Sequence, residues 1–334
     1  MTRPAAPTIP GHTGYGLMGF TTRTNQAPDS EIFPVLLTAL RLGATFWNSS
    51  VFYGTPTNPI ANIELLARFF AAYPEAIPQV TLSIKGAMNV ATMSAACDRA
   101  GITKSINDAY DLLNPVGKKI DIFECARVDP NVPIEESIKV IAEFVAEGKV
   151  GGIGLSETKA ETIRRAHAVH PIAGVEVEVS LWSREIFKNG VADTCAELGI
   201  PVIAYSPLGR GFLARRFEKI EDIPQGDFRR IFDRFQAEAF EKNEVIVKEV
   251  EKVAEELGVG RAQVALGWVR WRARQVDGLK LVPLPGATTE ERLSENMEVK
   301  DVGDEAYERL DKFMDRTEVV GGRYNDHHEK ELMQ

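Results

Sequence analysis

Short apolar segments alternate with longer amphipathic ones along most of the 334-residue chain. The apolar segments have the length of buried strands, and the amphipathic ones repeat their apolar residues at helical spacing. We expect eight strands, at 14–19, 45–48, 80–84, 120–125, 150–155, 174–179, 200–204 and 279–282. We expect helices at 30–42, 60–72, 103–113, 134–147, 159–168, 191–198, 243–257, 261–272, 289–296 and 304–313. Such repeated strand–helix units predict a parallel sheet covered by helices.

Two observations distinguish a closed barrel from an open sheet. Eight strands in strict alternation with helices fit a (β/α)8 barrel, and the chain has a suitable length. No Gly-x-Gly-x-x-Gly segment follows the first strand, which counts against an open dinucleotide-binding sheet. We therefore predict an α/β protein with the TIM-barrel fold. It should form a single domain over residues 1–334, with flexible ends at 1–12 and 325–334.

One connection is much longer than the others. Residues 207–242 follow the seventh predicted strand and begin with several arginines. The same segment contains six phenylalanines: Phe212, Phe217, Phe228, Phe232, Phe235 and Phe240. Long connections inside compact domains are usually functional or disordered. Because so many apolar rings favour packing, we predict an ordered lid.

Charge and cysteine content exclude several classes of function. The formal net charge of −9 argues against nucleic acid or an anionic membrane as the main partner. The three cysteines are widely spaced and form no Cys-x-x-Cys pair, so we expect neither a disulfide framework nor a metal site. We find no apolar run long enough for a membrane span and no signal-peptide core. We expect a soluble protein of the cytoplasm, with the nucleus as a second compartment, that is a monomer or a weak oligomer.

Two residues near the ends of successive predicted strands suggest a proton-transfer site. Tyr53 lies shortly after Asn48, which ends the second strand, and Lys85 directly follows the third. In a parallel barrel the carboxyl ends of all strands meet at one face, where active sites form. An ammonium group there would lower the pKa of the Tyr53 phenol and make it a usable proton donor.

The segments around these residues resemble the aldo-keto reductases, NADPH-dependent enzymes that reduce aldehydes and ketones. The family signature Asp-Thr-Ala-x-x-Tyr-Gly corresponds to residues 48–54, with Asn48 in place of the aspartate, and the family lysine falls on Lys85. Residues 204–208 read Ala-Tyr-Ser-Pro-Leu, and residues 283–296 match the signature at the phosphate end of the cofactor. The resemblance covers nearly the whole chain. It implies that Tyr53, Lys85 and Asn48 form the catalytic group.

The departures from the family pattern resemble one branch, the fungal pyridoxal reductases, which reduce the vitamin B6 aldehyde pyridoxal to pyridoxine with NADPH. Asn48 replaces the aspartate of the catalytic tetrad, and Ala126 replaces its histidine. The resemblance implies a small aldehyde, pyridoxal, as substrate, with Trp47, Ala126 and Arg127 around its pocket. Strand alternation puts Ile122, Glu124 and Ala126 on one face, which the resemblance implies is the barrel interior. There Glu124 is either a satisfied polar group or a carboxylate that partly restores the charge lost at Asn48.

The resemblance also implies a site for NADPH. Ser156 would hydrogen-bond the nicotinamide carboxamide, and Tyr205 would stack on its ring. Glu157 and Glu176 replace an asparagine and a glutamine of the family at the amide contacts. Further cofactor residues implied by the resemblance are Ser206, Leu208, Arg216, Gly286, Thr288, Arg292, Glu295 and Asn296. Arginines among them favour NADPH over NADH because their charge would pair with a 2′-phosphate. The C-terminal tail is expected near the pocket.

Three functions stay open at this point. The first is an NADPH-dependent pyridoxal reductase with Tyr53 as proton donor. The second is an aldo-keto reductase with a broader range of aldehydes, since fold and cofactor motifs do not fix the substrate. The third is a cofactor-binding regulatory subunit with little turnover, which the altered tetrad favours and the retained Tyr53 and Lys85 oppose. The proton on Lys85 beside Asn48 depends on desolvation, which only a structure shows.

Overall fold

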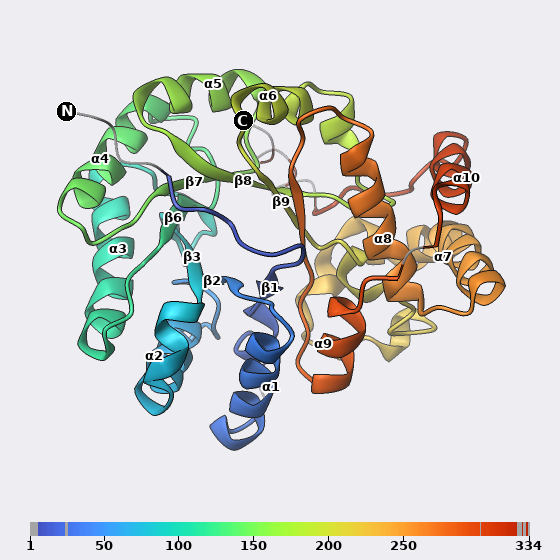
Figure 1. The fold of residues 1–334 in the computed structure, drawn as a ribbon, viewed down its shortest axis with the longest axis horizontal. Coiled ribbons are helices and arrows are strands. Elements are labelled where there is room, and N and C mark those ends of the chain that lie inside the picture. Colours follow the sequence, from blue (N-terminus) through green and yellow to red (C-terminus); the bar gives the residue numbers. More distant parts are fainter. Residues whose placement is uncertain (1–5, 24–25, 301, 326–328, 330–331, 333–334) are drawn as a thin grey trace.

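Eight parallel strands form the central sheet of the protein (Figure 1). The structure is a computed structural model, and it describes residues 6–23, 26–300, 302–325, 329 and 332. The strands are β1 (Tyr15–Gly16), β2 (Phe46–Ser50), β3 (Thr81–Gly86), β6 (Ile122–Cys125), β7 (Ile153–Ser156), β8 (Ile172–Glu178), β9 (Val202–Tyr205) and β10 (Leu281–Leu284). Each pairs with the next in chain order. Gly16 bridges to Gly286 in parallel, and its N–H donates to the carbonyl of Pro285 at 3.0 Å, so the last strand meets the first. The predicted barrel is confirmed.

The helices surround this sheet on its outside (Figure 1). They are α1 (Asp29–Arg41), α2 (Ala61–Ala72), α3 (Arg99–Leu113), α4 (Ile134–Ala146), α5 (Ala160–Val169), α6 (Val191–Leu198), α7 (Ala237–Leu257), α8 (Arg261–Arg274), α9 (Glu290–Met297) and α10 (Asp304–Asp315). Every predicted helix is present. Helix α3 begins earlier than predicted because the Asp98 side chain caps it, accepting the Gly101 N–H at 2.8 Å. The two-residue strands β4 (Met88–Asn89) and β5 (Ser94–Ala95) were not predicted, since they are too short to show a period.

Alternation along β2 decides which of its side chains enter the barrel. Phe46 packs in the barrel interior, and Asn48 faces the same way. Trp47 between them therefore faces the helices, where its ring lies 5.5 Å from that of Phe69 and 6.1 Å from that of Phe70 on α2. The prediction that Trp47 borders the substrate pocket is wrong, because its indole is fully buried on the opposite side of the strand.

The segment before β1 packs against the barrel. Ile9 is 1% exposed and belongs to the interior cluster with Phe46 and Leu284. Its carbonyl accepts a hydrogen bond from Lys280 Nζ at 2.9 Å. Ile9 is therefore packed, but the expected flexibility of residues 1–12 stays a prediction, and residues 1–5 lie outside the described part of the chain. The single domain over residues 1–334 stays a prediction.

The long connection after β9 is packed, as its phenylalanines predicted. It contains the short helices η5 (Gly209–Gly211), η6 (Ile220–Asp222), η7 (Phe228–Ile231) and η8 (Asp233–Phe235). All its phenylalanine rings except Phe228 are buried, and Phe212 stacks on Trp182 with ring centroids 4.6 Å apart. The connection is also bound to the C-terminal segment. Arg210 donates to the Arg323 carbonyl at 3.0 Å, and Arg234 donates to that of Gly321 at 3.2 Å.

Membrane-spanning helices and metal-binding groups were both expected to be absent from this protein. None of the helices in the described part of the chain is long and apolar enough to cross a membrane. Within the same residues, no group of histidine, cysteine, aspartate and glutamate side chains is placed to hold a metal ion.

Candidate active site

Lys85 lies at the carboxyl end of β3 and is the centre of a buried polar cluster. Its Nζ donates to Glu176 Oε1 at 2.7 Å and to Oδ1 of Asn48. The Asn48 amide in turn donates to Glu176 Oε2 at 2.7 Å and to Glu124 Oε1 at 3.3 Å. Strand register sets Lys85 opposite Glu124 on β6, and Glu176 lies near the carboxyl end of β8, opposite Ser156. The sequence predicted Asn48 and Lys85 here, but it placed Glu176 among the cofactor contacts.

This cluster keeps Lys85 charged. Burial alone would lower the pKa of Lys85, but the neighbouring Glu176, followed by Tyr53 and Glu124, raises it above its ordinary value. The Lys85 side chain is 6% exposed and that of Glu176 is 4% exposed, so water screens their ion pair weakly. The sequence left open whether Lys85 keeps its proton beside Asn48. The carboxylate of Glu176 on β8 keeps the lysine protonated.

Glu124 is the neutral member of the cluster. Burial and the nearby Glu176 raise the pKa of Glu124 well above its ordinary value, although Lys85 at 3.9 Å lowers it. Among the described residues, Oε2 of Glu124 finds no hydrogen-bond donor. A proton on that oxygen removes the problem, because the acid can then donate to Glu176. Glu124 thus faces the interior as predicted, but Glu176 is the carboxylate that compensates for Asn48.

Tyr53 lies in the loop after β2, with its ring 5.3 Å from Lys85 Nζ. The hydroxyl of Thr21 donates to the Tyr53 carbonyl at 2.7 Å and helps to hold this loop. Burial raises the pKa of Tyr53, Lys85 lowers it and Glu176 raises it again, so that it lies above its ordinary value. Lys85 lowers the pKa of Tyr53 as predicted, but burial outweighs this effect and Glu176 opposes it, so the net shift is upward. The phenol is therefore protonated at neutral pH, as a proton donor must be.

A second buried cluster surrounds Glu157, directly after β7. Arg323 donates to both its carboxylate oxygens, at 3.0 and 2.9 Å, and the Tyr205 hydroxyl donates at 2.7 Å. The hydroxyls of Tyr205 and Tyr324 are 3.0 Å apart. Burial raises the pKa of Glu157, but Arg323 and then Arg127 lower it by more, so the pKa lies below its ordinary value and the carboxyl is ionised. The C-terminal segment thus reaches the predicted nicotinamide residues, as expected of the tail.

Sequence reasoning did not assign a role to Arg323. The signal was present, because a glutamate at position 157 after a buried strand requires a cation. The sequence offers many arginines, and only the fold selects the one near the C-terminus. Glu157 also has a left-handed backbone with φ of 49°, as does Ser206 with φ of 52° after β9. Such conformations are uncommon for residues other than glycine and often occur at functional sites.

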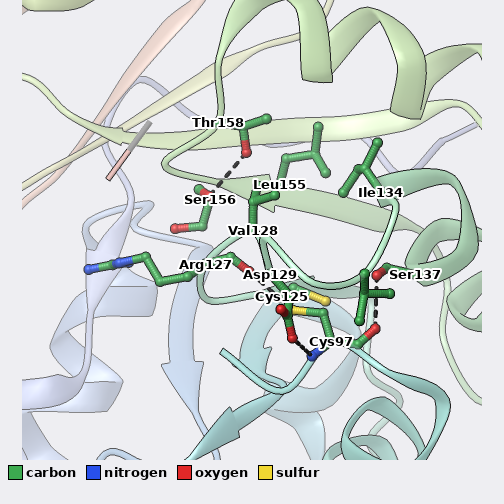
Figure 2. A pocket seen from close by; sticks show the side chains of 11 residues that line it. Cys97, Cys125, Arg127, Val128, Asp129, Ile134, Ser137, Leu155, Ser156 and Thr158 are labelled. Carbon is green, nitrogen blue, oxygen red and sulfur yellow. Dashed lines mark hydrogen bonds between the residues drawn. The ribbon is translucent and has the colours of Figure 1, made fainter. Parts of the chain in front are cut away.

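Ala126 and Arg127 follow β6 at the same mouth of the barrel. Ala126 is buried and offers no side-chain donor. The Arg127 guanidinium lies 5.5 Å from the ring centroid of Tyr324. Figure 2 shows its side chain pointing away from Cys97 and Cys125, which line a cavity of about 10 Å³. That cavity has room for about one water molecule, so the substrate must bind elsewhere.

Arginines gather at the predicted phosphate end of the cofactor site. Arg216, from the long connection, donates to Glu295 Oε2 at 2.6 Å, next to Arg292 on α9. Burial, Arg216 and Arg23 lower the pKa of Arg292, which shows that positive charges crowd this place. The Thr289 side chain caps α9 there, Thr288 lies just before it and Asn296 is buried on the helix. An excess of guanidinium groups beside a helix N-terminus fits a bound phosphate.

The remaining predicted cofactor residues follow the ends of β9 and β10. Ser206 directly follows β9, Leu208 comes two residues later, and Gly286 pairs with Gly16 where the barrel closes. Ser156 ends β7 and is buried beside Glu157. The fold therefore brings the predicted residues to one mouth of the barrel, with Trp47 as the exception.

Comparisons with known proteins agree with this geometry. A family model described as the aldo/keto reductase family matches residues 13–315. The chain is 40% identical over 328 residues to a protein named probable pyridoxal reductase 2 from Schizosaccharomyces pombe, covering 96% of this chain and 97% of that one. It is 35% identical over 337 residues to a putative pyridoxal reductase from Saccharomyces cerevisiae, covering 93% and 95%.

Two solved structures show the same fold. A glycerol dehydrogenase from Gluconobacter oxydans superposes with a TM-score of 0.76 at 22% identity, covering 94% of this chain and 95% of that chain. A thermostable aldo-keto reductase named Tm1743 superposes with a TM-score of 0.65 at 21% identity, covering 91% and 95%. At these identities the similarity concerns the fold alone.

Proposed function

The chain belongs to the aldo/keto reductase family, and from that premise we propose that it reduces pyridoxal to pyridoxine with NADPH. The substrate rests on one observation, the 40% identity to a probable pyridoxal reductase over 96% of the chain. The chemistry rests on Tyr53 and the charged Lys85 at the carboxyl ends of the strands. We also expect a cytoplasmic protein that acts as a monomer or a weak oligomer.

Tyr53 is the proton donor of the proposed reaction. When bound, NADPH supplies a hydride to the aldehyde carbon. As that bond forms, the Tyr53 phenol gives its proton to the carbonyl oxygen, and the product is a primary alcohol. The ammonium group of Lys85 stabilises the phenolate left behind, which regains a proton from solvent. The raised pKa of Tyr53 keeps the phenol in its donor form before each turnover.

The cofactor's two ends would meet different side chains. Arg216 and Arg292 would pair with the 2′-phosphate, where their mutual repulsion favours an anion. At the nicotinamide end, Glu157 offers hydrogen-bond acceptors and its partner Arg323 offers donors. Together the two side chains can serve both groups of a carboxamide, as a single amide side chain would. Ser156 lies at the same strand end.

Ala126 favours a substrate that carries its own hydrogen-bond donor beside the carbonyl group. With no side-chain donor at this position, Tyr53 must polarise the carbonyl without a second acid. Pyridoxal carries a 3-hydroxyl beside its aldehyde, which can hydrogen-bond to the developing alkoxide. The missing donor is therefore less costly for pyridoxal than for a simple aromatic aldehyde.

The test compares NADPH oxidation with pyridoxal, pyridoxal phosphate and 4-nitrobenzaldehyde, with Tyr53→Phe as the control variant. We expect kcat/KM to be highest for pyridoxal and to be lost in the variant. Equal rates for all aldehydes would indicate a reductase of broad range. The altered positions Asn48 and Ala126 also suit a regulatory subunit, and tight NADPH binding without turnover of any aldehyde would identify one.

A further inference from the structure

The ammonium group of Lys85 is held by a carboxylate and a carboxamide that come from different strands. We infer that Glu176 is a positioning residue, which supplies the counter-charge of Lys85 and thereby sets the field at Tyr53, with Asn48 as the bridge. The carboxylate and the amide should be exchangeable between positions 176 and 48. The part that concerns Tyr53 rests on the proposed function.

The contacts assign the counter-charge to Glu176. Its Oε1 is 2.7 Å from Lys85 Nζ, whereas Glu124 Oε1 is 3.9 Å away. Both oxygens of Glu176 are used, since Oε2 accepts the Asn48 amide at 2.7 Å. The three side chains form a closed triangle of hydrogen bonds. One positive and one negative charge are buried in it.

Glu124 can replace Glu176 as the negative charge beside Lys85 when Glu176 is neutralised. Two carboxylates cannot both ionise beside one buried ammonium group at low cost, so Glu124 holds its proton while Glu176 is charged. If Glu176 is replaced by glutamine, that repulsion disappears and Glu124 can ionise, at a longer distance from Lys85. Glu176→Gln alone should therefore impair the site, and Glu124→Gln combined with it should leave Lys85 with no counter-charge.

The triangle predicts which exchange is tolerated. In Asn48→Asp/Glu176→Gln, both positions keep a side chain of the same length and shape. Lys85 can still donate to an oxygen at each position. The bond between the two side chains is kept with its direction reversed, because the amide introduced at position 176 would donate to the new carboxylate at position 48. The number of buried charges is unchanged, so the exchanged site should work.

The kinetic test measures kcat, KM and the NADPH dissociation constant, the last from quenching of tryptophan fluorescence. Glu176→Gln should lose about 100-fold in kcat, the size of effect seen when a preorganised electrostatic group is removed. The matched change Glu124→Gln should decrease kcat by a factor at least about tenfold smaller than the factor for Glu176→Gln. The exchange variant should regain most of the loss in Glu176→Gln. An exchange variant no better than Glu176→Gln would overturn the inference, as would a Glu176→Gln enzyme with normal kcat.

A second measurement is independent of turnover. Lysine carrying carbon-13 at Cε allows the charge of Lys85 to be followed by NMR during a pH titration. We expect Lys85 to stay charged in the wild-type and exchange proteins, and to lose its proton within the titrated range in Glu124→Gln/Glu176→Gln. A lysine that stays charged in that variant, or is neutral in the exchange protein, contradicts the inference. If the wild type reduces no aldehyde, the proposed function fails, and this titration still decides the role of Glu176.

Discussion

Replacing Glu124 by glutamine should stabilise the protein at neutral pH. The carboxyl is fully buried, burial and the nearby Glu176 raise its pKa well above the ordinary value, and the protonated acid can donate to Glu176. Glutamine has nearly the same shape as a protonated glutamic acid, and its amide can donate to Glu176 in the same way. The variant therefore keeps the contacts of the folded state and removes only the ability to ionise.

The size of the effect follows from proton linkage. The pKa of Glu124 is raised in the folded chain, so the folded state keeps a proton that the unfolded chain releases above about pH 4.3. The stability that this proton supports is complete below that pH and is lost as the pH rises. Each pH unit costs about 1.4 kcal/mol, which gives at most about 4 kcal/mol between pH 4.3 and pH 7. For 334 residues the entropy of unfolding is about 0.7 kcal/mol/K, so Tm should rise by at most about 5 °C.

The assay is thermal unfolding of the wild type and Glu124→Gln at pH 4 and pH 7, followed by circular dichroism. We expect equal Tm values at the lower pH and a more stable variant at the higher one. Glu31→Gln, an exposed glutamate on α1, is the control and should change stability by less than about 0.5 kcal/mol at either pH. A variant that is less stable at pH 7, or that gains equally at both pH values, would refute the protonated Glu124.

Four further outcomes are expected. Because the pKa of Tyr53 is raised, aldehyde reduction should persist into alkaline solution, and alcohol oxidation, which needs the phenolate, should increase with pH; a pH–rate profile in both directions checks this. Arg323→Ala leaves Glu157 charged and buried without its cation, so denaturant unfolding should show a loss of about 3–5 kcal/mol, which Arg323→Lys should reduce. Arg292→Ala should weaken NADPH binding about 10- to 100-fold and NADH binding far less, and equal losses in a fluorescence titration would contradict the assigned phosphate site. A 3-O-methyl pyridoxal should be reduced with a much lower kcat/KM than pyridoxal, and an unchanged value would exclude help from the substrate's hydroxyl at Ala126.

The sequence predicted the barrel because its signals are local. Strand and helix periods are read from neighbouring residues, and the eight strands fall where the apolar runs are. The cofactor and proton-transfer segments are also continuous in the chain, so Tyr53, Lys85 and the residues before α9 could be selected without coordinates. The sequence could also have predicted the side of the strand on which Trp47 lies, because Trp47 and Asn48 are neighbours and must face opposite ways.

The tertiary structure decided which charges meet. Glu176 reaches Lys85 across 91 positions of the chain, and Arg323 reaches Glu157 across 166. No local pattern pairs them. The protonation of Glu124 and the raised pKa of Tyr53 depend on burial and on those same distant partners. Covalent order and periodicity place each residue on its element, whereas the electrostatic state of a buried group depends on every charge around it, and only the folded chain sets those distances.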